Sequence, residues 1–423
     1  MKIIMHNAVT SQNGNLFIEG VALETIATQY GTPSYVYSKA AISSNFLAYQ
    51  TALAEKDHLI CFAVKANSNI AVLQTLAELG AGFDIVSIGE LERVLRAGGD
   101  PAKVVFSGVA KTAAEMRRAL ELGIHCFNVE SEAELELLNA TAAAIDLPAA
   151  VSLRVNPDVD AQTHPYISTG LKENKFGIDI NLAPQVYQRA AQMSHINIVG
   201  VDCHIGSQLV DIEPFVAALE RLLVLVDQLA EHNISLEHID IGGGLGVRYE
   251  AEQPPSADDY MSAILPLLKG RSETLVLEPG RSITANAGVM LTQVQFLKSN
   301  GEKNFAIVDA AMNDMIRPAL YQAWMDIQPL SPGTAEIHSY DVVGPVCETG
   351  DFLAKDRSLA ISAGDYLCLF SAGAYGFVMS SNYNSRPRAP ELMVDGDQVH
   401  IIRQRETIED LLSGEQLLPG TQG

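Results

Sequence analysis

A lysine directly follows one of the short apolar runs in the first quarter of the chain. Lys65 comes after Cys61-Phe62-Ala63-Val64, a run typical of a buried strand. Desolvation disfavours the ammonium form, so a lysine in this position gives up its proton more easily than an exposed one, and a neutral amine can condense with an aldehyde. Asp84 lies within the apolar run Gly82–Val86, so a simple Lys65–Asp84 ion pair is the other interpretation.

A carboxylate ends another apolar run. Glu278 follows Leu275-Val276-Leu277, and a carboxylate in such surroundings must be paired or protonated. One possible role is to keep a pyridinium nitrogen protonated. The alternative is a salt bridge to Arg281 or to another nearby base.

Three consecutive glycines, Gly242, Gly243 and Gly244, allow backbone N–H groups to approach an anion closely. The run does not match GxGxxG, because Val247 stands where the third glycine is needed. It is followed by no Gly-Lys-Ser/Thr, so it is not a P-loop either. The sequence therefore predicts either a phosphate-binding turn or a tight strand-to-helix turn. A phosphate cup would be completed by Gly280 and Arg281.

His204 and Ser207 follow a further apolar run that ends at Cys203. A metal site is disfavoured, because positions i+2 to i+4 after His204 offer no second metal ligand. A histidine that stacks on a ring or donates a hydrogen bond fits better, and a hydrogen-bonded core histidine is the remaining alternative.

The last third of the chain contains three further candidates. Cys347-Glu348-Thr349-Gly350-Asp351 places a thiol and two carboxylates in one segment, which could also be a plain surface loop. Arg317 and Tyr321 lie four residues apart and would share one helix face. They could clamp a carboxylate or simply make a helix-surface contact. Tyr375 lies in Gly373-Ala374-Tyr375-Gly376, which permits close approach to a ligand or a place in the core.

The elements that position these residues alternate between strands and amphipathic helices. Helices are expected, for example, over 131–142 and 214–231, and one begins behind a Ser38 N-cap. Eight strands are expected, over 59–64, 82–86, 103–107, 124–129, 149–154, 196–203, 237–241 and 274–278. Eight β/α repeats predict a TIM-type (β/α)8 barrel over 38–285, in which working groups lie at the carboxyl ends of the strands. A doubly wound open sheet is the structural rival.

After residue 286 the pattern is mostly β, with strands expected over 289–297, 305–308, 366–370, 392–394 and 399–401. Asp395-Gly396-Asp397 is a hairpin turn signal, and Ser11–Asn15 is another. The fold class is therefore α/β plus β. The barrel is accompanied by a second, sandwich- or barrel-like β domain built from 286–423 and joined by 1–37.

Composition limits the partners. The 423 residues include 28 Lys and Arg against 51 Asp and Glu, a net charge of −23, which argues against nucleic acid or an anionic membrane. The five cysteines form no CxxC pair, so neither a disulfide framework nor a metal cluster is expected. With no signal-peptide pattern and no apolar stretch of spanning length, we expect a cytoplasmic protein.

Taken together, the Lys65, His204, Gly242–Gly244, Glu278, Cys347 and Tyr375 segments resemble, in order, the fold-type III pyridoxal-phosphate decarboxylases. Three further stretches are similar to those of the members that convert meso-2,6-diaminopimelate to L-lysine and CO2, the last step of lysine biosynthesis: Thr169–Gly177, Asn382–Pro387 and Arg403–Thr407.

The resemblance implies a role for each candidate. Lys65 would bind the aldehyde of pyridoxal 5′-phosphate, His204 would stack on its ring and Glu278 would bond the ring nitrogen. Cys347 would donate a proton. The remaining cofactor contacts would be Asp84, Ser207, Gly242, Gly243, Gly244, Pro279, Gly280, Arg281 and Tyr375. The substrate contacts would be Arg281, Arg317, Tyr321, Glu348 and Tyr375. The resemblance also implies a homodimer whose shared sites take Cys347 and Glu348 from the partner subunit.

Other functions fit parts of the pattern. The same scaffold could decarboxylate a different amino acid, or serve as a non-catalytic regulator, although a regulator would not need Lys65, Cys347 and Arg317 together. A racemase on a related plan would need an opposing pair of proton donors in place of the Cys347-Glu348 segment.

Overall fold

The computed structural model describes residues 8–159, 175–301 and 303–419, and the chain forms two compact units. One unit runs from Ile42 to Thr284, and the other combines Met1–Ala41 with Ala285–Gly423. We describe them in turn as the barrel unit and the β unit.

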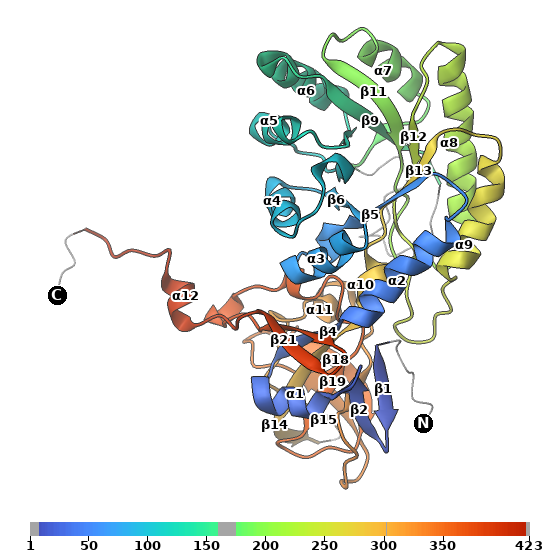
Figure 1. The fold of residues 1–423 in the computed structure, drawn as a ribbon. Coiled ribbons are helices and arrows are strands. Elements are labelled where there is room, and N and C mark those ends of the chain that lie inside the picture. Colours follow the sequence, from blue (N-terminus) through green and yellow to red (C-terminus); the bar gives the residue numbers. More distant parts are fainter. Residues whose placement is uncertain (1–7, 160–174, 302, 420–423) are drawn as a thin grey trace. The chain divides into compact units, whose positions relative to one another are not determined.

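Eight parallel strands close into a barrel in the first of these units (Figure 1). The strands pair in the order β9-β11-β12-β13-β5-β6-β7-β8, and β8 pairs with β9 to complete the ring. This confirms the predicted barrel and excludes the open sheet. The strands are β5 (His58–Ala63), β6 (Gly82–Ile85), β7 (Val104–Phe106), β8 (Cys126–Val129), β9 (Ala149–Asn156), β11 (Ile196–Asp202), β12 (His238–Asp240) and β13 (Thr274–Leu277). The short β10 (Ile178–Asp179) adds to β9.

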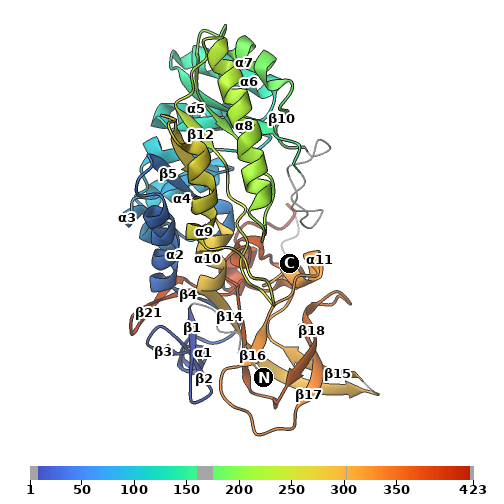
Figure 2. The ribbon, with the colours of Figure 1, turned by 90° about the vertical axis from the view of Figure 1, so that its right-hand side faces the viewer.

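Helices follow the strands, and several of them begin at side-chain caps. Ser38 Oγ accepts a hydrogen bond from the Ala41 N–H (3.0 Å), as the sequence predicts for the start of α2. Thr112 and Glu115 form a reciprocal capping box at the start of α5. The helices of this part of the chain are α2 (Lys39–Ala52), α3 (Ile70–Glu78), α4 (Ile88–Arg96), α5 (Ala113–Leu122), α6 (Glu132–Ile145), α7 (Ala183–Ala190), α8 (Glu213–Glu231), α9 (Ala257–Ile264) and α10 (Arg281–Thr284). The long α8 runs beside α9 on the flank of the barrel (Figure 2).

The inside of the barrel is filled by small and β-branched side chains. One buried cluster contains Cys61, Val105, Cys126, Val199 and Val276, which come from five different strands. Interdigitating side chains of this size are what a closed eight-stranded barrel can hold, so the barrel is a packed core and its working surface is at one end.

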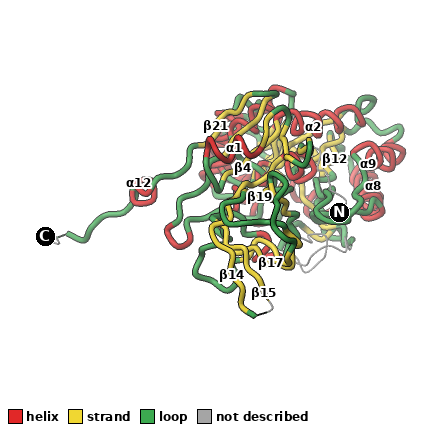
Figure 3. Tube along the Cα trace, turned by 90° about the horizontal axis from the view of Figure 1, so that it is seen from below, coloured by secondary structure: helices red, strands yellow, loops and turns green. Residues whose placement is uncertain are grey.

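The second unit is built on a sheet in which parallel and antiparallel pairs are mixed (Figure 3). Its order is β18-β17-β15-β14-β4-β20-β21; β19 pairs with β14, and β16 pairs with β19. The strands are β4 (Ser34–Ser38), β14 (Gly288–Asn300), β15 (Lys303–Val308), β16 (Ile327–Pro329), β17 (His338–Val343), β18 (Phe352–Leu359), β19 (Tyr366–Leu369), β20 (Glu391–Asp395) and β21 (Gln398–Arg403). The short helices are α1 (Leu23–Tyr30), α11 (Arg317–Tyr321) and α12 (Ile408–Leu412).

Both hairpin signals in this unit are confirmed. β1 (Val9–Gln12) and β2 (Asn15–Ile18) pair across Asn13-Gly14, and β20 and β21 pair across Gly396. Gly14 and Gly396 have φ of 84° and 66°, a conformation that glycine adopts without strain. The first hairpin continues to β3 (Val21–Ala22). Strand β4 joins the large sheet between β14 and β20, so an N-terminal strand does complete this unit. No strand was predicted for β16, β17 or β18.

Within the described ranges, no helix has both the length and the apolar character needed to cross a bilayer.

Candidate active site

The predicted aldehyde-binding lysine lies at the carboxyl end of β5, in the short 3-10 helix η1 (Val64–Ala66). Its ammonium forms an ion pair with Asp84, whose side chain is fully buried in β6, while the lysine side chain keeps 36% of its surface exposed. The ion-pair alternative is therefore present in this structure. The other carboxylate oxygen, Asp84 Oδ1, is buried and has no hydrogen-bond partner among the described residues.

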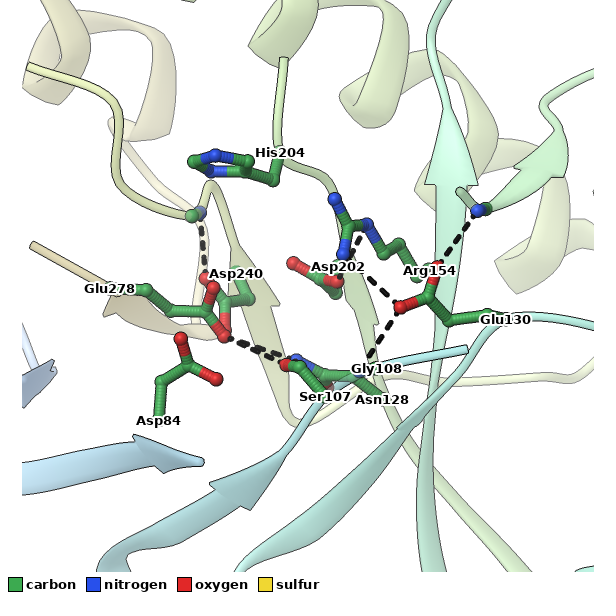
Figure 4. Close-up of polar contacts among 12 residues, drawn as sticks. Asp84, Ser107, Gly108, Asn128, Glu130, Arg154, Asp202, His204, Asp240 and Glu278 are labelled. Carbon is green, nitrogen blue, oxygen red and sulfur yellow. Dashed lines mark hydrogen bonds and ion pairs between the residues drawn. The ribbon is translucent and has the colours of Figure 1, made fainter. Parts of the chain in front are cut away.

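Glu278 follows β13, which is the neighbour of β5 in the barrel, so it lies at the same barrel end as Lys65. Its Oε1 accepts hydrogen bonds from Asn128 Nδ2 (3.2 Å) and Ser107 Oγ (3.5 Å), drawn as dashed lines in Figure 4. Burial, followed by repulsion from Asp240, raises the pKa of Glu278 well above its ordinary value. This acid group is thus fixed in place, and its raised pKa favours the protonated form.

The glycine run links the ends of β12 and β13. The Glu278 N–H donates to the Gly242 carbonyl (2.7 Å), and the Gly242 N–H donates to Asp240 Oδ1 (2.8 Å). A Cβ atom added to Gly243 would lie 2.2 Å from the Glu278 carbonyl oxygen. Glycine is therefore required for the close approach of the β12 and β13 ends.

His204 lies after β11 and faces the glycine run. The Gly243 N–H donates to His204 Nδ1 (3.3 Å), which fixes the ring against that turn. Burial, and then the charges of Arg154 and Lys65, lower the pKa of His204 well below its ordinary value. The imidazole is consequently neutral, as suits a ring that stacks on a planar group.

Ser207 and Arg281 contact each other. The guanidinium of Arg281 donates from Nε (3.2 Å) and Nη2 (3.0 Å) to Ser207 Oγ, and from Nη1 to the Tyr249 hydroxyl (2.7 Å). Arg281 is only 7% exposed. The sequence analysis missed Tyr249, which lies in a loop without any strand-end signal.

A second buried ion network lies at the same end of the barrel. Glu130 accepts from Arg154 Nη1 (3.2 Å) and from the N–H groups of Gly108 (3.1 Å) and Gly177 (3.0 Å). Arg154 Nε also lies 3.9 Å from Asp202 Oδ2. Figure 4 shows this network beside Glu278 and Asp240, so the buried guanidinium of Arg154 lies in a site rich in carboxylates.

In the β unit, two predicted segments contact each other. The Cys347 N–H donates to Asn384 Oδ1 (2.8 Å), and the Tyr383 hydroxyl donates to Glu348 Oε1 (2.7 Å). The Cys347 thiol is exposed. Asp351 closes the loop by accepting from the N–H groups of Met312 and Val346, both at 2.7 Å. The thiol is therefore presented by an ordered turn.

Arg317 and Tyr321 are the first and last residues of α11, as their spacing predicts. Arg317 is 7% exposed and its Nη1 lies 3.6 Å from Met325 Sδ. Tyr375 adopts φ of 54°, an uncommon conformation for a tyrosine. A strained backbone at this position is consistent with a side chain held for a purpose.

Several polar residues of the barrel end were absent from the predicted site: Ser107, Asn128, Glu130, Asp202 and Asp240. Each lies at or just beyond the carboxyl end of a barrel strand. The rule that located Lys65 and Glu278 would have found them had it been applied to every strand. Of the Thr169–Gly177 segment, residues 169–174 lie outside the described residues.

This barrel end combines an amine, a neutral imidazole, a carboxyl group with a raised pKa and a glycine-lined turn. Such a set can bind an aldehyde covalently, stack on a ring, hold a protonated ring nitrogen and accommodate a phosphate.

Comparisons with known proteins agree with this chemistry. Residues 39–285 match the family model described as the pyridoxal-dependent decarboxylase, pyridoxal binding domain. Diaminopimelate decarboxylase of Pseudomonas aeruginosa is 66% identical over 408 residues, which cover 96% of this chain and 98% of the relative. The Vibrio cholerae protein of the same name is 58% identical over 409 residues, covering 96% and 98%.

Solved structures give the same result. Diaminopimelate decarboxylase from M. jannaschii superposes with a TM-score of 0.94 at 38% identity and covers 98% of this chain and 99% of its own. The Helicobacter pylori enzyme complexed with L-lysine has a TM-score of 0.90 at 45% identity, with coverage of 92% and 98%.

Proposed function

This chain belongs to the diaminopimelate decarboxylase family of pyridoxal-phosphate-dependent decarboxylases, and from that premise we propose how its own residues carry out the reaction. The reaction is the decarboxylation of meso-2,6-diaminopimelate to L-lysine and CO2, with pyridoxal 5′-phosphate as cofactor. The observation that carries the residue assignment is the placement of Lys65, Asp84 and Glu278 at the ends of three consecutive barrel strands, β5, β6 and β13.

The residues present fit the cofactor. Lys65 offers an amine for its aldehyde, and Glu278 offers a buried carboxyl for its ring nitrogen. The glycine run, Ser207, Gly280, Arg281 and Tyr375 would surround its phosphate. Asp84 Oδ1 is a buried oxygen without a hydrogen-bond partner among the described residues, so the site has a polar atom that a bound group could contact. Residues 38–285 would thus be the cofactor-binding domain, and 1–37 with 286–423 would supply substrate contacts.

Each side chain then has a physical task. When bound, the cofactor delocalises the electron pair left at the substrate α-carbon as CO2 departs. Glu278 would hold the proton at the ring nitrogen, and His204 would pack on the ring face. Lys65 would hold the cofactor by its aldehyde before the substrate amine binds and after the product leaves. Cys347 donates a proton to the α-carbon from its thiol, which completes the replacement of CO2 by hydrogen.

Substrate choice rests on the far end of diaminopimelate, which carries a second amine and a second carboxylate. Arg317, with Arg281 and Tyr321, would bind the distal carboxylate, because a guanidinium can donate two parallel hydrogen bonds to it. Glu348 would pair with the distal ammonium. A diamino acid that lacks the second carboxylate would leave these arginines without a partner.

We also propose that the active unit is a homodimer with shared sites, in which Cys347 and Glu348 act in the partner's site. The exposed Cys347 thiol, held in an ordered turn, supports this assignment. We further propose a cytoplasmic location, supported by five cysteines that all remain free.

The function is tested by incubating the protein with pyridoxal 5′-phosphate and meso-diaminopimelate, and then measuring L-lysine and CO2. We expect equal amounts of the two products, and none from Lys65→Ala. Release of CO2 from ornithine or lysine instead would favour another decarboxylase. Loss of stereochemistry without CO2 would indicate a racemase, and cofactor binding without turnover would indicate a regulator.

A further inference from the structure

The carboxyl group of Glu278 lies beside a second buried carboxyl group, that of Asp240. Asp240 ends β12 and Glu278 follows β13, which pair directly, and Figure 4 shows the two groups side by side. One oxygen from each of Asp240, Glu278 and Asp202 lies within 4.8 Å of the others. Asp240 is 0% exposed and Glu278 is 6% exposed.

The hydrogen-bond donors around this pair serve one oxygen of each group. Asn128 and Ser107 donate to Glu278 Oε1, and the Gly242 N–H donates to Asp240 Oδ1. Asp240 Oδ2 is buried, and nothing in the described part of the chain donates to it. Two carboxylates cannot donate to each other. A proton placed on one of them supplies the missing donor and removes the repulsion between them.

The surrounding charges leave this proton in place. The cations facing the pair, Lys65 and Arg154, are engaged by Asp84 and by Glu130 with Asp202. The nearby thiols of Cys61, Cys126 and Cys203 are neutral, because burial raises the pKa of each well above its ordinary value. Burial and the repulsion of neighbouring carboxylates likewise raise the pKa of both Asp240 and Glu278.

We propose that Asp240 and Glu278 share one proton in the cofactor-free protein, and that this proton becomes the ring-nitrogen proton of pyridoxal 5′-phosphate when the cofactor binds. The O–H bond of the pair breaks and its electrons remain on the carboxylate. The lone pair of the ring nitrogen forms the new N–H bond, so no other reactant is needed. Asp240 acts through Glu278 and is a positioning residue. The inference rests on the proposed function, which places Glu278 at the ring nitrogen.

The test is the number of protons taken from solvent when the cofactor binds. The full chain is freed of cofactor and titrated with pyridoxal 5′-phosphate in a calorimeter, near pH 8, in buffers that differ in ionisation enthalpy. Wild type takes its ring proton from the pair. In Asp240→Asn the amide N–H can donate to the Glu278 carboxylate and the repulsion from Asp240 is gone, so Glu278 is ionised, and the variant should take up about one more proton per site from the buffer than wild type. Equal uptake by the two proteins would overturn the proposal.

Asp202→Asn is the matched control, because it neutralises the third carboxylate of the same cluster. Asp202 Oδ1 is also buried without a partner among the described residues, but Asp202 Oδ2 lies 3.9 Å from the guanidinium of Arg154. Its proton uptake should equal that of wild type. An increase as large as that of Asp240→Asn would mean that the charge of the whole cluster sets the count, and the pair would lose its assigned role.

A measurement on wild type alone covers the case in which a variant fails to fold. Infrared difference spectra between the cofactor-free and the loaded protein at neutral pH should show that the C=O stretch of one protonated carboxyl group is lost as pyridoxal 5′-phosphate is added. A difference spectrum without this loss contradicts the inference. If pyridoxal 5′-phosphate binds while the proton count is unchanged, only this inference fails. If it does not bind at all, the proposed function fails too.

Discussion

At the scale of single residues, the site depends on polar side chains placed where the barrel strands end. Lys65, Asp84 and Glu278 come from consecutive strands of the barrel. The groups of the site differ in their electrostatic state. The lysine is ion-paired, the glutamate is buried beside another acid and the imidazole of His204 is neutral. A site of this kind separates the tasks of binding an aldehyde, holding a ring proton and packing on a ring.

Arg317 offers a test of substrate recognition. Arg317→Ala should raise the KM for meso-diaminopimelate roughly tenfold to a hundredfold, since it would remove the proposed charge-assisted hydrogen bond to the distal carboxylate. The absorbance of the bound cofactor should not change. Steady-state kinetics and a cofactor titration check both expectations.

Arg317→Lys is the control, because it keeps the charge and loses the paired N–H geometry. It should fall between wild type and Arg317→Ala. If Arg317→Ala weakened cofactor binding as strongly as it weakened use of the substrate, the assignment to the distal carboxylate would be wrong.

Sequence reasoning located the residues with unusual types at strand ends but not those that hold them. Lys65 and Glu278 stand out because a charge follows an apolar run. Tyr249 does not, because it lies in a loop and becomes important only when the folded chain brings it to Arg281. Asn128 does lie near a strand end, but its contact with Glu278 exists only in the folded chain. Contacts between residues 150 and 32 positions apart cannot be read from local spacing.

At the scale of elements, glycines set how closely the strand ends approach. Gly243→Ala should lower the stability of the barrel unit by about 1–3 kcal/mol and weaken cofactor binding, because its Cβ would lie 2.2 Å from the Glu278 carbonyl oxygen. Denaturant midpoints followed by circular dichroism, together with a cofactor titration, provide the measurement.

Gly89→Ala in α4 is the matched control. The nearest atom to its added Cβ is Ser87 Oγ at 3.8 Å, and alanine favours a helix, so stability should hold or rise by about 0.5–1 kcal/mol. Similar losses from the two substitutions would show that close packing at Gly243 is not what matters.

A buried ion pair joins the loop after β7 to α6. Lys111 Nζ lies 2.7 Å from Glu134 Oε1 and also donates to the carbonyls of Gly108 (2.8 Å) and Asn128 (2.7 Å). Lys111→Ala leaves the carboxylate buried without its cation and should destabilise the protein by about 3–5 kcal/mol. Urea unfolding measures this loss.

The exposed Arg117–Glu121 pair on α5 is the comparison. Arg117→Ala should change stability by no more than about 0.5 kcal/mol, because water already solvates both groups. If Lys111→Ala also changed the stability only slightly, Glu134 would have to be protonated or reached by water when the lysine is absent.

The elements were more predictable than the contacts between them. The eight barrel strands follow from apolar runs buried on both faces, and the two hairpins follow from glycine-containing turns. Strands β17 and β18 escaped prediction because exposed residues break their apolar pattern, as in Lys355-Asp356 within β18. Their pairing is decided by the neighbouring strand rather than by their own sequence.

At the scale of the whole molecule, the proposed homodimer predicts complementation. Lys65→Ala and Cys347→Ala should each be inactive alone. After subunit exchange, half of the dimers are mixed and each of these holds one intact site, so about a quarter of the wild-type activity should return. An activity assay before and after mixing measures it. If no activity returns although mixed dimers form, each chain supplies both residues to its own site.

The central claim is that Lys65 captures the cofactor, and reductive trapping tests it most directly. The loaded protein is reduced with borohydride, digested and sequenced by mass spectrometry. The account predicts the pyridoxyl phosphate adduct on Lys65, and no adduct in Lys65→Ala. An adduct on another lysine, or none in the wild-type protein, would contradict it.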